Sequence, residues 1–349
     1  MSRVGLKPEK TREIMGSSQV AGSKLIQDAS EQLLQVENPK PLVFNITIAE
    51  TRFRIYVSSQ DLWDLIHPAL SWKAQTPGLE PDIEIFALEG VGGMVSPWIL
   101  EDFLDGSRIK GLENGAVLGT FELESTTLSL YDRSTRRGLF WVKSASDLPD
   151  WEFGAPLRRI FEWALLDRGF HVIHSAGVGK GENGVLLSGS GGAGKSTTTA
   201  MCLSNDFETT GDDYCAISAT SPHKVFGIYG LLKLVPGAVG TEGLPNSTWL
   251  KRRIDGKVHY KIEQKMVESL VINAIVFPKV AVSTKQLVPV SPKNAFLRLL
   301  SSTLNQSTNP QIQLFEALGT LSRSVAAFEL EIGPDFALVG RNLSDLWAK

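Results

Sequence analysis

Residues 188–200 read SGSGGAGKSTTTA, and this stretch limits the fold more than any other part of the chain. Residues 189–196 satisfy the pattern G-x-x-x-x-G-K-[ST]. The glycines let the backbone curl, so that successive N–H groups point inward at an anion. The candidate phosphate-binding residues are Gly189, Ser190, Gly191, Gly192, Ala193, Gly194, Lys195, Ser196 and Thr197.

The segments on either side of this loop support a phosphate-binding interpretation. GVLLSG at 184–189 is typical of a buried strand, and KSTTTAMCL at 195–203 is typical of a helix. A helix that begins at the loop adds the partial positive charge of its N-terminus. Lys195 is expected to reach the β- and γ-phosphates of ATP, and the Ser196 hydroxyl to ligate Mg²⁺. The alternative is a glycine-rich turn without a ligand, which the flanking strand and helix disfavour.

Two further segments carry candidate catalytic residues. Asp212 and Asp213 begin the strand-like DDYCAIS, and Asp212 follows Lys195 by 17 residues. Neighbouring side chains of a regular strand face opposite ways, so one carboxylate would face the phosphates while the other orients it or binds the metal. The alternative is an exposed Asp-Asp turn. His174 precedes Lys195 by 21 residues in HVIHSAGV, a strand predicted to fold back beside GVLLSG; the alternative is a structural histidine.

The composition excludes several other classes of protein. The 35 basic and 38 acidic residues give a net charge of −3, which leaves no strong field for nucleic acid or anionic lipid. The chain has no apolar run of the ~18 residues that a membrane helix needs, and Met1–Lys10 lacks the apolar segment of a signal peptide. Cys202 and Cys215 are too few for a disulfide framework. We therefore expect a cytoplasmic protein that binds neither nucleic acid nor membrane.

Hydrophobic patterning predicts three segments. Residues 1–40 are an N-terminal tail with an amphipathic helix, and residues 41–150 are a smaller α+β domain with an antiparallel sheet that serves as scaffold or substrate-docking unit. Residues 151–349 alternate strands and helices, as an α/β domain does. Core or domain contacts are expected of Trp63, Trp72, Trp98 and Trp141. The apolar residues at helical spacing in the tail are Leu25, Ile26, Ala29, Leu33 and Leu34.

The order of these motifs resembles the catalytic domain of HPr kinase/phosphorylase, whose fold is related to phosphoenolpyruvate carboxykinase. His174, Lys195-Ser196 and Asp212-Asp213 match that family's motifs at the same spacing, strongly over residues 171–217 and loosely to about 340. PLRR at 156–159 and the preceding domain make the layout more similar to the broader HPr-kinase-related group. That group includes the lasso-peptide kinases, which phosphorylate a serine of a precursor peptide.

The resemblance implies a role for each matched residue. The loop at 189–196 would bind ATP, and Ser196 with Asp212 would hold Mg²⁺. Asp213 would accept the proton of the attacking hydroxyl, and His174 would support the aspartates electrostatically. The family's usual serine at the third loop position is Gly191 here.

The leading hypothesis is an ATP-dependent kinase of a Ser/Thr hydroxyl in a peptide or small protein, and self-association into a homo-oligomer is allowed. Two alternatives stay open: a kinase of a small-molecule alcohol, and a non-catalytic nucleotide-binding regulator. Lys233 is expected either near the phosphates or in solvent at a strand end. Residues 236–249 suit a closing loop, and the basic run Lys251, Arg252 and Arg253 suits either ligand binding or a solvated surface.

Overall fold

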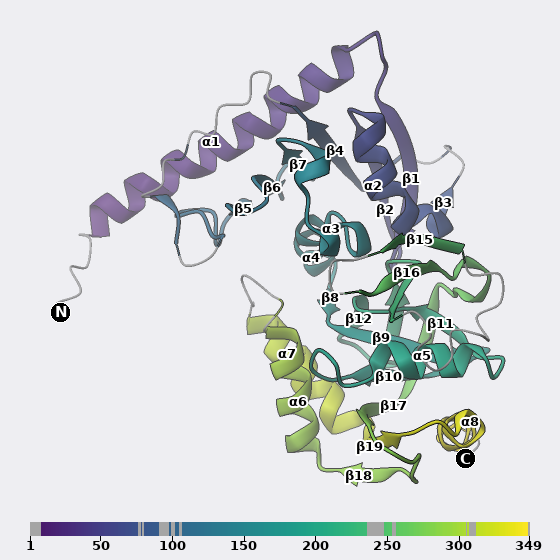
Figure 1. Ribbon diagram of the computed structural model, residues 1–349. Helices are drawn as coiled ribbons and strands as arrows, with labels where there is room; N and C mark the ends of the chain where they lie inside the picture. The colour runs from purple at the N-terminus through teal and green to yellow at the C-terminus, as the bar shows by residue number, and fades with distance from the viewer. Residues whose placement is uncertain are drawn as a thin grey trace.

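The computed structural model describes residues 8–75, 78, 80–90, 98, 102–104, 107–235, 248–252, 256–304, 306 and 312–347, and gives side chains in these ranges except at 8–15 and 248–252. These ranges form a mixed α/β protein with eight α-helices and three sheets, which confirms the predicted α/β class (Figure 1). The suggested closing loop at 236–247 and the side chains of the basic run at 251–253 lie outside the described residues.

The N-terminal third builds a seven-stranded sheet with the order β3-β1-β2-β4-β7-β6-β5. A long helix, α1 (Pro8–Gln35), precedes it, in the segment where the sequence predicts a tail with an amphipathic helix. A second helix, α2 (Gln60–Leu70), follows β2, and a 3₁₀ turn covers Ser71–Lys73. The strands are β1 (Leu42–Ile48), β2 (Thr51–Val57), β3 (Ala74–Gln75), β4 (Ile83–Glu89), β5 (Val117–Glu122), β6 (Thr127–Asp132) and β7 (Arg137–Val142).

This sheet is mixed, and the prediction of an antiparallel sheet is wrong. The hairpins β1–β2, β5–β6 and β6–β7 are antiparallel, whereas β4 pairs in parallel with both β2 and β7. Two crossover connections produce these parallel pairs, because a long connection can return the chain to the end of the sheet where the previous strand began. The connection from β2 to β4 contains α2, and the connection from β4 to β7 contains the hairpin β5–β6. The alternation of apolar and polar residues is the same for both pairings, so it could not distinguish them.

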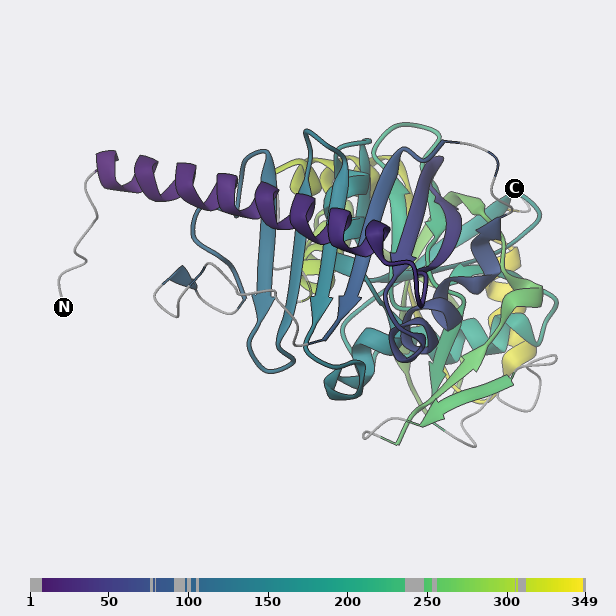
Figure 2. The same ribbon diagram turned by 90° about the horizontal axis from the view of Figure 1, so that it is seen from above.

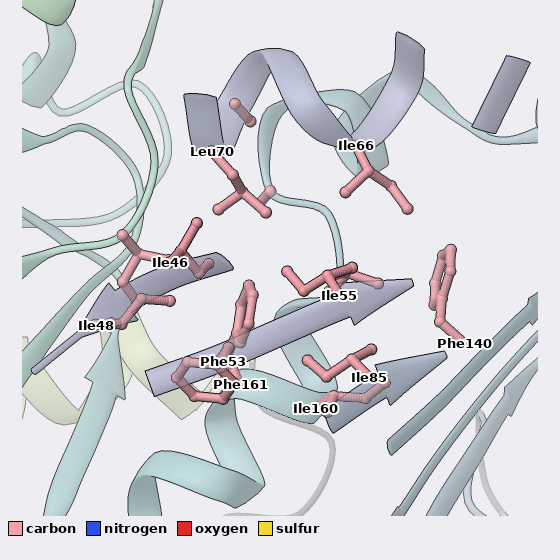
Figure 3. Packing of buried hydrophobic residues seen from close by; sticks show 14 of the residues in the cluster. Ile46, Ile48, Phe53, Ile55, Ile66, Leu70, Ile85, Phe140, Ile160 and Phe161 are labelled. Carbon is pink, nitrogen blue, oxygen red and sulfur yellow. The ribbon is translucent and has the colours of Figure 1, made fainter. Parts of the chain in front are cut away.

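Helices cover both faces of this sheet. On one face, α1 crosses the strands and buries Ile26, Ala29 and Leu33, while Leu34 points outward with 49% of its surface exposed (Figure 2). On the other face, α2 contributes Ile66 and Leu70, and α4 (Arg158–Leu166) contributes Ile160 and Phe161 to the same layer (Figure 3).

The second sheet has nine strands, with the main order β11-β9-β10-β17-β13-β12-β8 and with β19 and β18 added beside β17. It is also mixed, because β10 and β19 run parallel to β17 while the other pairs are antiparallel. The strands are β8 (Phe170–Ile173), β9 (Ser175–Lys180), β10 (Asn183–Ser188), β11 (Glu208–Gly211), β12 (Cys215–Ser218), β13 (Lys224–Gly227), β17 (Ser269–Val280), β18 (Val288–Val290) and β19 (Ala326–Ile332).

Four helices cover the two faces of this second sheet. Helices α5 (Lys195–Leu203) and α8 (Phe336–Ser344) pack on one face, and α6 (Pro292–Leu304) and α7 (Ile312–Ser324) pack on the other. Strand β10 lies between them, with Leu186 in the core under α6 and α7 and with Val185 and Leu187 in the core under α5. Because both faces are covered, the centre of β10 is a run of consecutive apolar residues at 185–187, as the sequence predicts for GVLLSG.

A third, smaller sheet and a short helix complete the fold. Strands β14 (Leu231–Leu234), β15 (Thr248–Arg252) and β16 (Val258–Lys261) pair in the order β14-β16-β15. Helix α3 (Asp150–Gly154) precedes α4, and both lie between the first and second sheets (Figure 1). Short 3₁₀ turns cover Ala145–Asp147 and Glu263–Lys265.

The first two sheets share one hydrophobic core. A continuous cluster runs from Phe53 of the first sheet through Phe161 of α4 to Tyr229 beside the second sheet. Trp72 reinforces the junction: its Nε1 donates a hydrogen bond to the carbonyl oxygen of Ile228 at 3.2 Å. The predicted segment boundaries at residues 40 and 150 are not visible as breaks in the packing, because the hydrophobic core continues across them. These boundaries therefore stay predictions. Within the described residues, no helix combines the length and the apolar character that a membrane crossing requires.

Candidate functional site

The glycine-rich loop connects the end of β10 to the first turn of α5, as the sequence predicts. Gly192 and Gly194 have φ angles of 81° and 107°, in the left-handed region that favours glycine. A Cβ on Gly194 would also lie 2.6 Å from Cδ1 of Ile332, so that position excludes any side chain. Gly191 has open space where its Cβ would be, which leaves the concave side of the loop clear for a ligand.

Lys195 lies inside the loop. Only 6% of its surface is exposed, and its Nζ donates a hydrogen bond to the carbonyl oxygen of Gly189 at 2.7 Å. Burial lowers the pKa of Lys195, and the charges of Asp212 and Asp213 oppose this shift. The ammonium group is thus held beside the loop backbone by carbonyl dipoles and two nearby carboxylates.

Asp212 and Asp213 lie in a bend between β11 and β12. The expectation that they belong to a regular strand is wrong, because Asp213 has a φ of 75° and β12 begins at Cys215. A left-handed conformation is uncommon for a residue other than glycine and costs of the order of 1–3 kcal/mol. The bend, rather than strand alternation, sends the two carboxylates in different directions.

Asp213 is held by a basic side chain on each side. His174 Nε2 lies 3.0 Å from Oδ1, and the Lys233 ammonium contacts Oδ2. His174 comes from the junction of β8 and β9, and β9 pairs antiparallel with β10, as predicted. Lys233 comes from β14 of the third sheet, so two separate sheets converge on one carboxylate. Of the two positions expected for Lys233, the structure has it in the site.

Ser302 of α6 connects His174 to the glycine-rich loop. The Ser302 carbonyl oxygen lies 3.3 Å from Nδ1 of His174. The Ser302 hydroxyl lies 3.1 Å from the carbonyl oxygens of both His174 and Gly189, to either of which it can donate. The histidine ring is 6% exposed and is therefore fixed from both ends.

The two aspartates have opposite pKa shifts. Burial raises the pKa of Asp212, and the neighbouring charge of Asp213 raises it further. Burial would also raise the pKa of Asp213, but Lys233 and the hydrogen bond from His174 together lower it well below its ordinary value. Asp213 is therefore an ion in this arrangement, whereas the charges of Lys233 and Lys195 offset the upward shift of Asp212 only in part.

Asp212 is suited to a hard cation. It is 2% exposed, and its Oδ1 is a buried oxygen without a hydrogen-bond partner in the described part of the chain. The Ser196 hydroxyl hydrogen-bonds the same carboxylate and lowers its pKa. Mg²⁺ prefers such oxygen ligands and keeps several waters, so a carboxylate and a hydroxyl fit it. Among the described residues no group of three or more His, Cys, Asp or Glu side chains could hold a metal by itself.

Two cavities meet at Asp213. One, of about 200 Å³, covers the loop from Gly191 to Thr197. The other, of about 380 Å³, opens toward Trp151, Arg158 and Gln306. Residues that line both cavities are His174, Gly191, Ser196, Asp213, Lys233 and Lys257.

A third and larger cavity of about 590 Å³ lies behind the loop. It begins at Gly189 and Ser190 and extends to Phe277, Arg298 and Glu329. Arg298 lies over the Phe277 ring at 5.2 Å and pairs with Glu329 at 2.8 Å. The glycine-rich loop therefore contributes to the walls of more than one cavity.

The sequence did not identify Glu152, Arg158 and Gln306 as site residues. Arg158 and Arg159 both donate to the Gln306 carbonyl oxygen, at 2.7 and 3.0 Å. The Gln306 side chain in turn accepts a hydrogen bond from Tyr214, the neighbour of Asp213, at 2.9 Å. The PLRR motif was the one sequence feature that pointed to these arginines, but their partner Gln306 lies almost 150 residues away in the sequence. Only tertiary structure reveals such a contact.

A scan against models of known protein families found no match for this chain. A search of curated proteins also found none.

Proposed function

We propose that this protein is an ATP-dependent phosphotransferase of the HPr-kinase-like type, which transfers the γ-phosphoryl group to a hydroxyl of a peptide or small protein. One observation carries the proposal: Asp213 lines both the cavity over the glycine-rich loop and the adjoining cavity of about 380 Å³. A carboxylate between a phosphate cradle and a second cavity is positioned to act on an acceptor hydroxyl.

Nucleotide binding would be the task of the loop. Its inward backbone N–H groups, the N-terminus of α5 and the Lys195 ammonium group all favour the phosphates. Ser196 and Asp212 would hold Mg²⁺, which when bound neutralises charge on the phosphate oxygens. The partnerless Oδ1 of Asp212 supports this assignment.

Asp213 would accept the proton of the acceptor hydroxyl. As it does so, the hydroxyl oxygen bonds to the γ-phosphorus, and the bond from that phosphorus to the bridging oxygen of ADP breaks. The lowered pKa of Asp213 makes it a weak base. Phosphoryl transfer tolerates a weak base, because its loose transition state depends mainly on positioning and charge neutralisation.

His174 and Lys233 would act as positioning residues through Asp213. They hold its two oxygens from opposite sides and keep it ionised, and both also line the cavities. A carboxylate that is fixed and charged before the substrates bind needs no reorganisation during the reaction.

Incubation with Mg·ATP and candidate acceptors, read by mass spectrometry for an added phosphate, tests the proposal. Peptides with Ser or Thr and small alcohols serve as separate arms, and Lys195→Ala is the control for loop-dependent transfer. A phosphorylated alcohol with unmodified peptides would favour the small-molecule kinase. Binding of Mg·ATP with neither ADP formation nor phosphorylation of any acceptor would refute the kinase and favour the nucleotide-binding regulator.

A further inference from the structure

The cavity that adjoins Asp213 has a wall built by the segment that joins the first and second sheets. Trp151, Glu152 and Ala155 come from α3 and the residue after it, and Arg158 begins α4. Leu157, between them, has a φ of 59°, and this left-handed turn separates α3 from α4. The opposite wall contains Ser196 and Asp213.

Arg158 is the charged group of this wall that is best suited to an anion. Its Nη1 donates to the Gln306 carbonyl oxygen at 2.7 Å, and its guanidinium lies 4.6 Å from the centre of the Tyr214 ring. A guanidinium has five N–H donors in a planar fork, so these contacts leave donors for a ligand.

Arg159 provides an internal comparison. It donates to the same Gln306 carbonyl oxygen, at 3.0 Å, but it is paired with Glu162 at 3.5 Å and with Glu122 at 3.8 Å. Arg159 is absent from the cavity wall. The two arginines therefore share a structural contact and differ in their access to the cavity.

The charges around this cavity favour an anion. Arg158 adds positive charge to a wall where Asp213 is already balanced by Lys233. Glu152 is the opposing group, and burial raises its pKa to about 7, although Arg158 and Arg159 oppose this shift. Its carboxyl group is therefore partly neutral near pH 7 and offsets the positive charge only in part.

We propose that Arg158 binds a carboxylate that the acceptor carries beside its reactive hydroxyl, so that the substrate is an acidic Ser/Thr peptide. This inference rests on the proposed function, because it takes the 380 Å³ cavity as the acceptor site. A guanidinium and a carboxylate form paired, charge-assisted hydrogen bonds, which would fix the peptide with its hydroxyl toward Asp213.

The test compares two peptides of nearly identical shape, acetyl-Gly-Ser-Asp-amide and acetyl-Gly-Ser-Asn-amide. Their affinities are measured by calorimetry on the full chain saturated with Mg²⁺ and a non-hydrolysable ATP analogue, so that the loop is already occupied. We expect the Asp peptide to bind about tenfold more tightly or better, as a hydrogen bond to a charged group suggests.

Arg158→Met and Arg159→Met form a matched pair of variants. Both lose a donor to Gln306, but we expect only Arg158→Met to abolish the preference for the Asp peptide. The inference is overturned if the two peptides bind equally to the unmodified protein, which includes no detectable binding of either. A preference that survives Arg158→Met, or that both variants lose alike, also overturns it.

A third peptide, acetyl-Gly-Ser-Lys-amide, tests the opposite charge preference. Tighter binding of this peptide would assign acceptor recognition to Glu152 and overturn the role of Arg158. Transfer of phosphate to neutral or basic peptides that is as efficient as transfer to the Asp peptide would refute this inference and leave the proposed kinase intact. Failure of the proposed function would appear separately, as absence of Mg·ATP binding or of ADP formation.

Discussion

Replacement of Asp213 by asparagine tests the centre of the proposed mechanism. Asparagine keeps the size and hydrogen-bonding capacity of the side chain and removes the charge. We expect phosphoryl transfer to fall by about 10²-fold or more, the usual loss for a positioned base, which corresponds to about 2.7 kcal/mol in the barrier. Affinity for Mg·ATP should stay within a few-fold, because Ser196 and Asp212 are assigned to the cation.

The same substitution should also destabilise the protein. Asp213 is the counter-ion of Lys233, whose side chain is only 13% exposed. Removal of one partner of a buried pair costs ~3–5 kcal/mol, and we expect about 2 kcal/mol because Lys233 retains some contact with water. The double variant Asp213→Asn, Lys233→Met removes both charges and should regain most of this stability. It should not regain transfer.

Single-turnover transfer, nucleotide affinity and urea unfolding of the single and double variants separate these effects. Asp212→Asn is the companion variant, and it should raise the Mg²⁺ concentration needed for half-maximal rate. Normal transfer by Asp213→Asn would refute the assignment of the base. If the double variant recovered transfer together with stability, the loss in the single variant would be a folding effect, and the mechanism would be refuted as well.

Three further predictions follow from other parts of the structure. Lys195→Ala should lower transfer by about 10²–10³-fold and weaken ATP binding as well, and steady-state kinetics that match the unmodified protein would contradict the loop assignment. Ser196→Ala should raise the Mg²⁺ requirement without loss of the fold, and activity that persists in excess chelator would contradict both metal ligands. Hydrogen bonds from Arg52 lower the pKa of Asp82 to about 2, so this carboxylate stabilises the fold above its ordinary pKa and ceases to do so as the pH falls toward 2. Asp82→Asn should therefore be less stable than the unmodified protein at pH 7, with a difference that vanishes in acid; a constant difference in melting temperature between pH 7 and 2 would contradict this.

The sequence predicted the parts of the site that are local in the chain. The glycine-rich loop, the strand before it and the helix after it lie within about 20 consecutive residues, and the structure has them as expected. His174 could be located as well, because a short turn between two strands predicts an antiparallel pair. Short-range order of this kind follows from hydrophobic periodicity and glycine positions.

Contacts between distant parts of the chain could not be predicted in this way. Lys233 reaches Asp213 from another sheet, and Ser302 approaches His174 across 128 residues. Neither residue differs from an ordinary surface lysine or helical serine in its local sequence. The left-handed φ of Asp213 could not be predicted either, because the residues that follow it directly are typical of a strand. Tertiary packing decides each of these contacts.

The shared core between the first two sheets has a thermodynamic consequence. Phe53, Phe161 and Tyr229 belong to one continuous cluster, so unfolding either sheet alone would expose apolar residues of the other part of that cluster to water. The two halves should therefore melt as one cooperative unit. A nucleotide that binds the loop of the folded protein raises the free energy of unfolding of this whole unit. Nucleotide binding should therefore also protect the strands under α1, far from the loop, against thermal unfolding.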